Sequence, residues 1–90
     1  MSTRKFHLGQ VVITPAAKTT LSNNDVVNAL TRHISGDFGI VSKDDKALNE
    51  EAIKTGDRIL SAYKDRKGIK FWIITECDRS ATTIMLPSEY

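Results

Sequence analysis

The chain has 90 residues, with 13 basic and 11 acidic side chains and a formal net charge of +2. This length allows a single domain, residues 1–90, because domains typically contain roughly 100–150 residues. One cysteine excludes an internal disulfide framework, and the nearly balanced charge excludes an overall field that would attract nucleic acid or membranes. No apolar run reaches the ~18 residues of a membrane span, and the start has no signal-peptide core, so we expect a cytoplasmic protein without membrane association.

In the first half of the chain, the pattern predicts one strand followed by helices. Alternating apolar residues indicate a strand over Lys5–Ile13, and Thr14 followed by proline begins a short helical turn. A helix is expected from Ser22 to Gly36, with Asp25 completing a capping box in which aspartate takes the place of glutamate. A second helix, with a weaker apolar stripe, extends from Ser42 to Gly56.

In the second half of the chain, the apolar pattern has a period of two, which predicts three strands joined by tight turns. These strands span Arg58–Lys64, Ile69–Glu76 and Ala81–Leu86. The middle one carries apolar residues on both faces and is therefore expected at the centre of the sheet. The sequence thus predicts an α+β fold: a small antiparallel sheet of about four strands in the order β-α-α-β-β-β, with two or three short helices on one face.

The candidates for catalysis are isolated residues rather than a recognisable constellation. His33 lies one helical turn before Asp37, which suits an oriented general base but equally suits a core histidine near a helix C-terminus. Cys77 offers a thiol, and Glu76 and Arg79 stand beside the last turn, yet each also fits an ordinary structural role. Neither histidine has a carboxylate at a metal-ligand spacing, and the glycines form no phosphate-binding loop. We therefore predict no catalytic residue, metal site or cofactor, unless His33, Asp37, Glu76 and Arg79 share one concave surface.

The only concentrated basic feature surrounds the predicted turn between the first two strands of the second half. It comprises Lys64, Arg66, Lys67 and Lys70, with Tyr63 and Trp72 nearby in the sequence. A basic hairpin with adjacent aromatic residues favours contact with a nucleic-acid backbone and exposed bases. The alternative is a solvated turn whose lysines discourage aggregation of the sheet.

Five stretches of the chain resemble a family of small bacterial proteins carried by plasmids and other mobile elements. They are Leu8–Pro15, Arg32–Gly39, Arg58–Tyr63, Trp72–Glu76 and Asp78–Pro87. The family has tryptophan where this chain has Phe38. Members are labelled plasmid-related or hypothetical, and some as a type I restriction subunit, a role that needs a cofactor-binding domain far larger than this chain. The resemblance implies a mobile-element setting and supplies no activity or catalytic residues.

Small size, the lack of a catalytic constellation and this resemblance predict a non-enzymatic accessory protein of a mobile element that binds a bacterial host protein or complex. We expect an inhibitor of host defence, of the anti-CRISPR or anti-restriction type. The predicted contact residues are Tyr63, Lys64, Arg66, Lys67, Lys70 and Trp72 around the hairpin, with Asp37 and Phe38 as a second patch. Acidic residues gather instead at the second helix, and such opposite local charges favour a protein partner over nucleic acid. Two alternatives stay open: a nucleic-acid-binding or RNA-cleaving toxin-like protein that uses the basic 64–70 hairpin, and a structural module that forms a homodimer through an exposed sheet edge.

Overall fold

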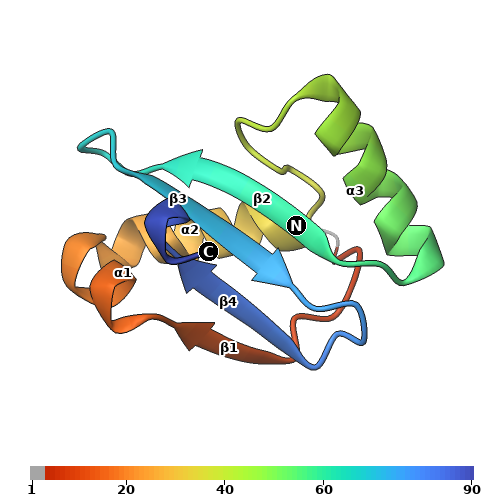
Figure 1. Ribbon diagram of the computed structural model, residues 1–90, viewed down its shortest axis with the longest axis horizontal. Helices are drawn as coiled ribbons and strands as arrows, with labels where there is room; N and C mark the ends of the chain where they lie inside the picture. The colour runs from red at the N-terminus through yellow and green to blue at the C-terminus, as the bar shows by residue number, and fades with distance from the viewer. Residues whose placement is uncertain (1–3) are drawn as a thin grey trace.

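The computed structural model describes residues 4–90. The protein contains one four-stranded sheet, and Figure 1 shows its strands side by side with the helices around them. The elements in chain order are β1 (Gln10–Ile13), α1 (Pro15–Thr20), α2 (Asn23–Ile34), α3 (Lys43–Thr55), β2 (Ile59–Lys64), β3 (Lys70–Thr75), β4 (Ala81–Met85) and the short 3₁₀ helix η1 (Pro87–Glu89). The predicted α+β class and the predicted order of strands and helices are confirmed.

The sheet is mixed, because its first strand joins the others in parallel. The strand order is β1-β4-β3-β2, with antiparallel pairs between β2 and β3 and between β3 and β4. β1 pairs in parallel with β4, from Gln10 opposite Ala81 to Ile13 opposite Ile84. The expected antiparallel pairing therefore holds for β2, β3 and β4, whereas β1 pairs in parallel at one edge of the sheet. A helical crossover returns the chain to the end of the sheet where β1 begins, so β2 and β4 both run in the direction of β1.

β1 is shorter than the strand expected over Lys5–Ile13. Gly9 has a φ of 65° and lies so close to the β3–β4 turn that an added Cβ would collide with the Arg79 and Ser80 backbone. The residues before Gly9 leave the sheet, and the Lys5 N–H donates to the Ile34 carbonyl at the end of α2 at 2.9 Å. Gly9 therefore allows the N-terminal segment, residues 4–9, to turn from the sheet toward α2.

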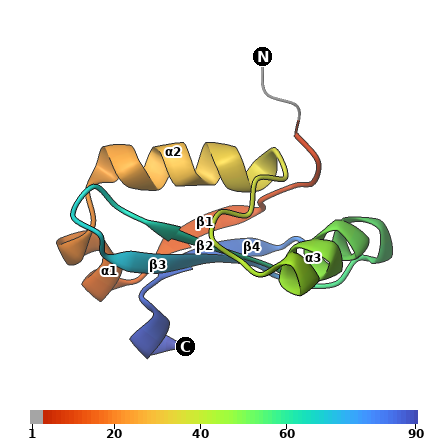
Figure 2. The same ribbon diagram turned by 90° about the horizontal axis from the view of Figure 1, so that it is seen from above.

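Helix α2 covers one face of the sheet, whereas α3 lies beside the β2 edge (Figure 2). The main core contains Ala17, Leu21, Val26, Ala29, Tyr63, Phe71, Ile73 and Ile84. A smaller cluster of Phe38, Ala52 and Ile59 holds α3 and the loop before it. Because the apolar stripe of α3 is narrow, this helix packs at the edge rather than on the sheet face with α2.

The outward backbone groups of β2, at the edge of the sheet, form hydrogen bonds with residues outside the sheet. Asn49 of α3 donates its side-chain amide to the Leu60 carbonyl at 2.7 Å and accepts the Leu60 N–H at 3.1 Å. The loop after α2 adds a short bridge: the Ala62 N–H donates to the Phe38 carbonyl at 3.1 Å, and the Ile40 N–H donates to the Ala62 carbonyl at 2.8 Å. The outward backbone groups of both Leu60 and Ala62 are therefore paired, which protects this edge from other strands.

Gly39 makes the bridge to β2 possible. Its φ is 75°, and an added Cβ would collide with the Ala62 carbonyl and stand 2.7 Å from the Tyr63 ring. We expect Gly39→Ala to lower the free energy of unfolding by about 2–4 kcal/mol, because a left-handed backbone is costly for alanine and the collision adds to that penalty. Urea unfolding followed by circular dichroism measures the change.

Gly68 in the β2–β3 turn provides the matched control. It has a similar φ of 83°, but an added Cβ would meet no atom within 4 Å. Gly68→Ala should therefore show the backbone penalty alone, about 1–2 kcal/mol. Equal losses in the two variants would contradict the proposed role of Gly39.

Candidate functional site

The basic hairpin is less available to a partner than its sequence suggests, because Arg66 is already paired. The Arg66 backbone N–H and guanidinium donate to the Asp25 carboxylate at 3.0, 3.1 and 3.2 Å. These hydrogen bonds lower the pKa of Asp25. The predicted capping box is wrong: Ser22 makes no side-chain cap hydrogen bond, and Asp25 binds the hairpin instead.

The hairpin cations that form no ion pair among the described residues are its lysines. Lys64, Lys67 and Lys70 are all exposed. Asp65 is buried and accepts the N–H groups of Lys67 and Ile69, both at 2.9 Å, which fixes the turn from inside. The three lysines therefore surround a rigid tip whose other charged residues have structural roles.

Two predicted contact residues lie in the interior, and this corrects the expected surface. Tyr63 is 2% exposed and Phe38 is 3% exposed. Strand alternation turns Tyr63 toward α2, where its hydroxyl donates to the Asp37 carbonyl at 2.6 Å, and burial raises the pKa of Tyr63 to about 12. Neither aromatic ring is available to a partner of the folded protein.

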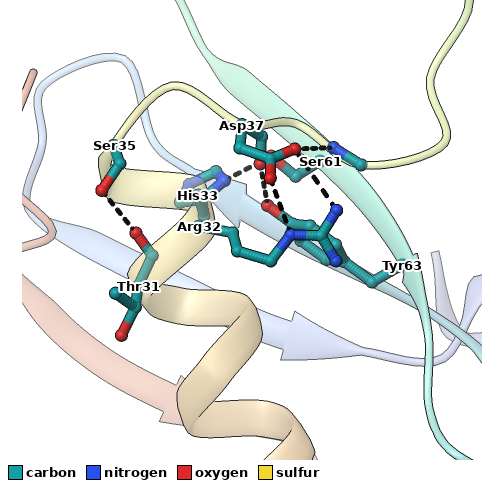
Figure 3. Close-up of polar contacts among 8 residues, drawn as sticks. Thr31, Arg32, His33, Ser35, Asp37, Ser61 and Tyr63 are labelled. Carbon is teal, nitrogen blue, oxygen red and sulfur yellow. Dashed lines mark hydrogen bonds and ion pairs between the residues drawn. The ribbon is translucent and has the colours of Figure 1, made fainter. Parts of the chain in front are cut away.

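The remaining predicted contacts lie on different parts of the surface. Trp72 points to the sheet face opposite α2, where its ring meets the Tyr90 ring edge-on at a centroid distance of 5.5 Å. Asp37 forms an ion pair with Arg32 at 2.8 Å, and the Arg32 guanidinium lies 4.9 Å from the centre of the Tyr63 ring (Figure 3). The hydrogen bond from Arg32 lowers the pKa of Asp37. The predicted residues therefore do not form a single patch.

His33 is completely buried and joins α2 to two strands of the sheet. Its Nδ1 lies 2.5 Å from the Ser61 hydroxyl, as Figure 3 shows, and its Nε2 lies 2.8 Å from the Thr75 hydroxyl. Thr75 in turn lies 2.8 Å from Thr82, whose hydroxyl donates to the Leu8 carbonyl at 2.7 Å. One hydrogen-bonded chain thus connects β2, α2, β3, β4 and the N-terminal segment.

The direction of this chain places a proton on Nε2 of the His33 ring. Since the Thr82 proton goes to the Leu8 carbonyl, Thr75 must donate to Thr82 and accept from the histidine. The ring therefore carries a proton on Nε2, and in its neutral form it accepts the Ser61 hydroxyl proton at Nδ1. Burial lowers the pKa of His33 to about 4, with a smaller contribution from the positive charge of Arg79.

The other residues considered for catalysis do not assemble around His33. The guanidinium of Arg79 binds the backbone carbonyls of Asp57 and Ala52 at 2.6 and 2.9 Å, which ties the β3–β4 turn to the end of α3. Glu76 and Cys77 are exposed, whereas His33 has no exposed surface. Within residues 4–90, no three His, Cys, Asp or Glu side chains are grouped so that they could hold a metal ion.

The outer edge of β1 is open, in contrast to that of β2. β1 is the last strand of the sheet, and its Gln10 and Thr14 N–H groups donate toward β4 at 3.0 and 3.1 Å. Strand alternation therefore directs the N–H and C=O groups of Val11 and Ile13 away from the sheet. Val11 and Val12 are 47% and 41% exposed. No hydrogen bond from residues 4–90 reaches these outward groups, so the edge presents backbone donors and acceptors together with aliphatic side chains.

A groove of about 540 Å³ lies next to this edge, between α2 and the N-terminal segment. It is lined by Arg4, Phe6, His7, Leu8, Gly9, Val11, Val27, Leu30, Thr31 and Ile34. The sequence pattern does not reveal this groove, because it predicts residues 5–8 as part of the strand. The available signal was Gly9, which interrupts the strand pattern at the point where the chain turns toward α2.

Comparisons with protein-family models, with curated proteins and with solved structures find no match for this chain. The resemblance to small plasmid proteins therefore stays a prediction from the sequence. No helix among the described residues is long and apolar enough to cross a membrane. The open β1 edge and its groove are therefore the features of the described structure that bear on function.

The buried histidine predicts a specific dependence of stability on pH. The unfolded chain has an ordinary histidine pKa near 6.5, and the folded chain holds it at about 4, so acid favours the unfolded state. The free energy of unfolding should be highest above pH 6.5 and about 3 kcal/mol lower at pH 4. Urea unfolding across this pH range measures the loss, and NMR titration of the His33 ring measures the pKa directly.

Two variants separate His33 from the other groups. His33→Gln should remove most of the slope between pH 6.5 and 4, and His7→Gln, which changes an exposed histidine, should retain it. The pKa values of Asp25 and Asp37 are lowered from 3.8. The stability that these carboxylates contribute is therefore lost mainly below about pH 3.8, outside the range in which His33 titrates. A His33 ring that titrates near pH 6.5 in the folded protein would contradict the buried neutral network.

Proposed function

We propose that this protein is a non-enzymatic binding module whose partner adds an extended segment to the open edge of β1. The observation that carries this proposal is the difference between the two sheet edges in the pairing of their outward backbone groups. Asn49 and the loop at Phe38 and Ile40 pair the outward groups of β2, whereas β1 exposes Val11 and Val12 at its free edge. Proteins usually protect edge strands with lysine, proline, a bulge or a covering segment, because an open apolar edge pairs with other chains.

Strand addition suits the chemistry of this edge. The outward N–H and C=O groups of Val11 and Ile13 supply regularly spaced hydrogen bonds to an incoming backbone. Side chains at alternate positions of that backbone would then meet the α2 face of the sheet and supply selectivity. Binding through the backbone requires no reactive side chain, which is consistent with the enclosed His33 and with the separate positions of Glu76 and Cys77.

The proposed setting is that of a mobile-element accessory protein acting on a bacterial host protein. The resemblance of five sequence stretches to small plasmid proteins supports this part of the proposal. A strand captured by β1 would be withheld from its normal interactions, which is a direct way to inhibit a host defence complex of the CRISPR or restriction type. Inhibition would then follow from occupancy alone.

Nucleic-acid binding through the hairpin is the second candidate, and the exposed Lys64, Lys67 and Lys70 favour it. The pairing of Arg66 with Asp25 removes one cation from that surface. A labelled single-stranded oligonucleotide tests this candidate: its binding should weaken steeply as salt rises and should be lost in Lys67→Glu. Salt-insensitive or absent binding would exclude the hairpin as a nucleic-acid site.

Site-specific photo-crosslinking in bacterial cells tests the edge. With the photoreactive residue p-benzoylphenylalanine at exposed Gln10, we expect one discrete adduct, whereas the same residue at exposed Leu48 on α3 should give none. Val11→Pro should abolish the adduct, because proline removes an outward N–H without breaking the ladder to β4. Val11→Ala, which keeps that N–H, should retain most of the adduct.

Two outcomes would contradict this proposal. An adduct of twice the 10.0 kDa chain would replace the host partner with a second copy of the protein. An adduct that survives in Val11→Pro would show that the partner does not add a strand to β1. Thermal unfolding of each variant, followed by circular dichroism, confirms that the comparison is made between folded proteins.

A further inference from the structure

The groove beside β1 has polar groups from Arg4, His7 and Thr31 and an apolar floor, whose side chains come from three segments of the chain. Phe6 and Leu8 come from the N-terminal segment, Val11 from β1, and Val27, Leu30 and Ile34 from α2. Val27 and Val11 remain 60% and 47% exposed, although both are aliphatic. The apolar surface of α2 therefore extends beyond the part that the sheet covers, toward the open edge.

The position of this floor determines which partner residues reach it. A strand added to β1 would lie about 4.8 Å further out, and its side chains would alternate between the two sheet faces. Val11 is on the α2 side of the sheet, whereas Val12 points to the opposite side. Alternate residues of the added strand would therefore face the groove, and its apolar floor favours aliphatic side chains at those positions.

Among the described residues, the ionisable side chains that line the groove are basic. Arg4 and His7 belong to the N-terminal segment, and none of the described residues that line the groove is acidic. The hydrogen bond from the Lys5 N–H to the Ile34 carbonyl holds this segment against the end of α2. Arg4 thus lines the groove near that end of α2. Among the described residues no ion pair involves it, so its guanidinium can donate hydrogen bonds to a carboxylate of a partner.

We propose that the groove selects extended peptide segments with aliphatic residues at alternate positions and an acidic side chain near Arg4. This inference rests on the proposed strand addition to β1 and adds to it the chemical class of the partner. The backbone edge supplies hydrogen bonds that are independent of sequence, and the groove distinguishes one segment from another. Arg4 supplies the charge-dependent part of that selection.

A phage-displayed library of random dodecapeptides, selected on the whole protein, tests this inference. We expect enrichment of peptides that alternate aliphatic residues and carry an aspartate or glutamate. A fluorescein-labelled copy of the most enriched peptide is then measured by fluorescence anisotropy. Arg4→Glu should weaken its binding tenfold or more at low salt, and the difference should shrink as salt rises.

Matched variants separate the groove from general effects of charge and exposure. Lys67→Glu makes the same charge reversal on the hairpin and should leave peptide affinity unchanged. Val27→Asp places a carboxylate in the groove and should weaken binding about tenfold, because it opposes both the apolar floor and the acidic peptide. Leu48→Asp, at a 66% exposed leucine of α3 outside the groove, should have no effect.

The outcomes distinguish failure of this inference from failure of strand addition. Enriched peptides without acidic residues, or an affinity unchanged in Arg4→Glu, would overturn the proposed carboxylate selection and leave strand addition intact if Val11→Pro still abolishes binding. Enriched peptides whose affinity is unchanged in Val11→Pro would overturn strand addition itself. Failure to enrich any peptide would overturn both.

Discussion

The hydrogen-bonded chain through His33 is the constraint on which the rest of the structure depends. One neutral imidazole connects α2 to Ser61 and Thr75, and Thr82 extends the connection to the Leu8 carbonyl. Within residues 4–90, every buried side-chain polar atom has a partner. Apolar contacts alone would allow a helix to shift along the sheet. Directional hydrogen bonds form at only one position of the helix. The place of α2, and therefore of the groove beside it, follows from this network.

The N-terminal segment links the buried network to the surface. The Phe6 ring meets the His33 ring edge-on at a centroid distance of 5.1 Å, and the Arg79 guanidinium lies 5.7 Å from the centre of the Phe6 ring. Phe6 thus helps to exclude water from the histidine and also lines the groove. The same fold of residues 4–9 stabilises the neutral imidazole and creates a binding surface. Binding at the groove would accordingly contact the segment that encloses the core.

Local sequence patterns predict the elements well and their long-range pairing poorly. The Thr14 and Ser42 side chains accept N-terminal helix N–H groups, as their positions indicate. By contrast, the parallel pairing of β1 depends on a strand seventy positions later, and no local pattern specifies it. Ser61, Thr75 and Thr82 resemble ordinary strand residues in the sequence. The register of the sheet brings Ser61 and Thr75 to His33, and Thr82 to Thr75. The predicted contact surface failed in part for the same reason, because parity in the folded sheet decides which aromatic residues are buried.

The structure shows how some of the nearly balanced charges of the chain are used. Asp25 pairs with Arg66, and Asp37 pairs with Arg32. These four charges therefore form contacts within the chain, although the sequence alone offers them for contact with a partner. A domain of this size has few side chains left for recognition. Strand addition solves that problem physically, because the backbone of β1 supplies the hydrogen bonds and only a few groove residues need to discriminate. Selectivity then depends on the position of Arg4 relative to the aliphatic floor rather than on the total charge of the protein.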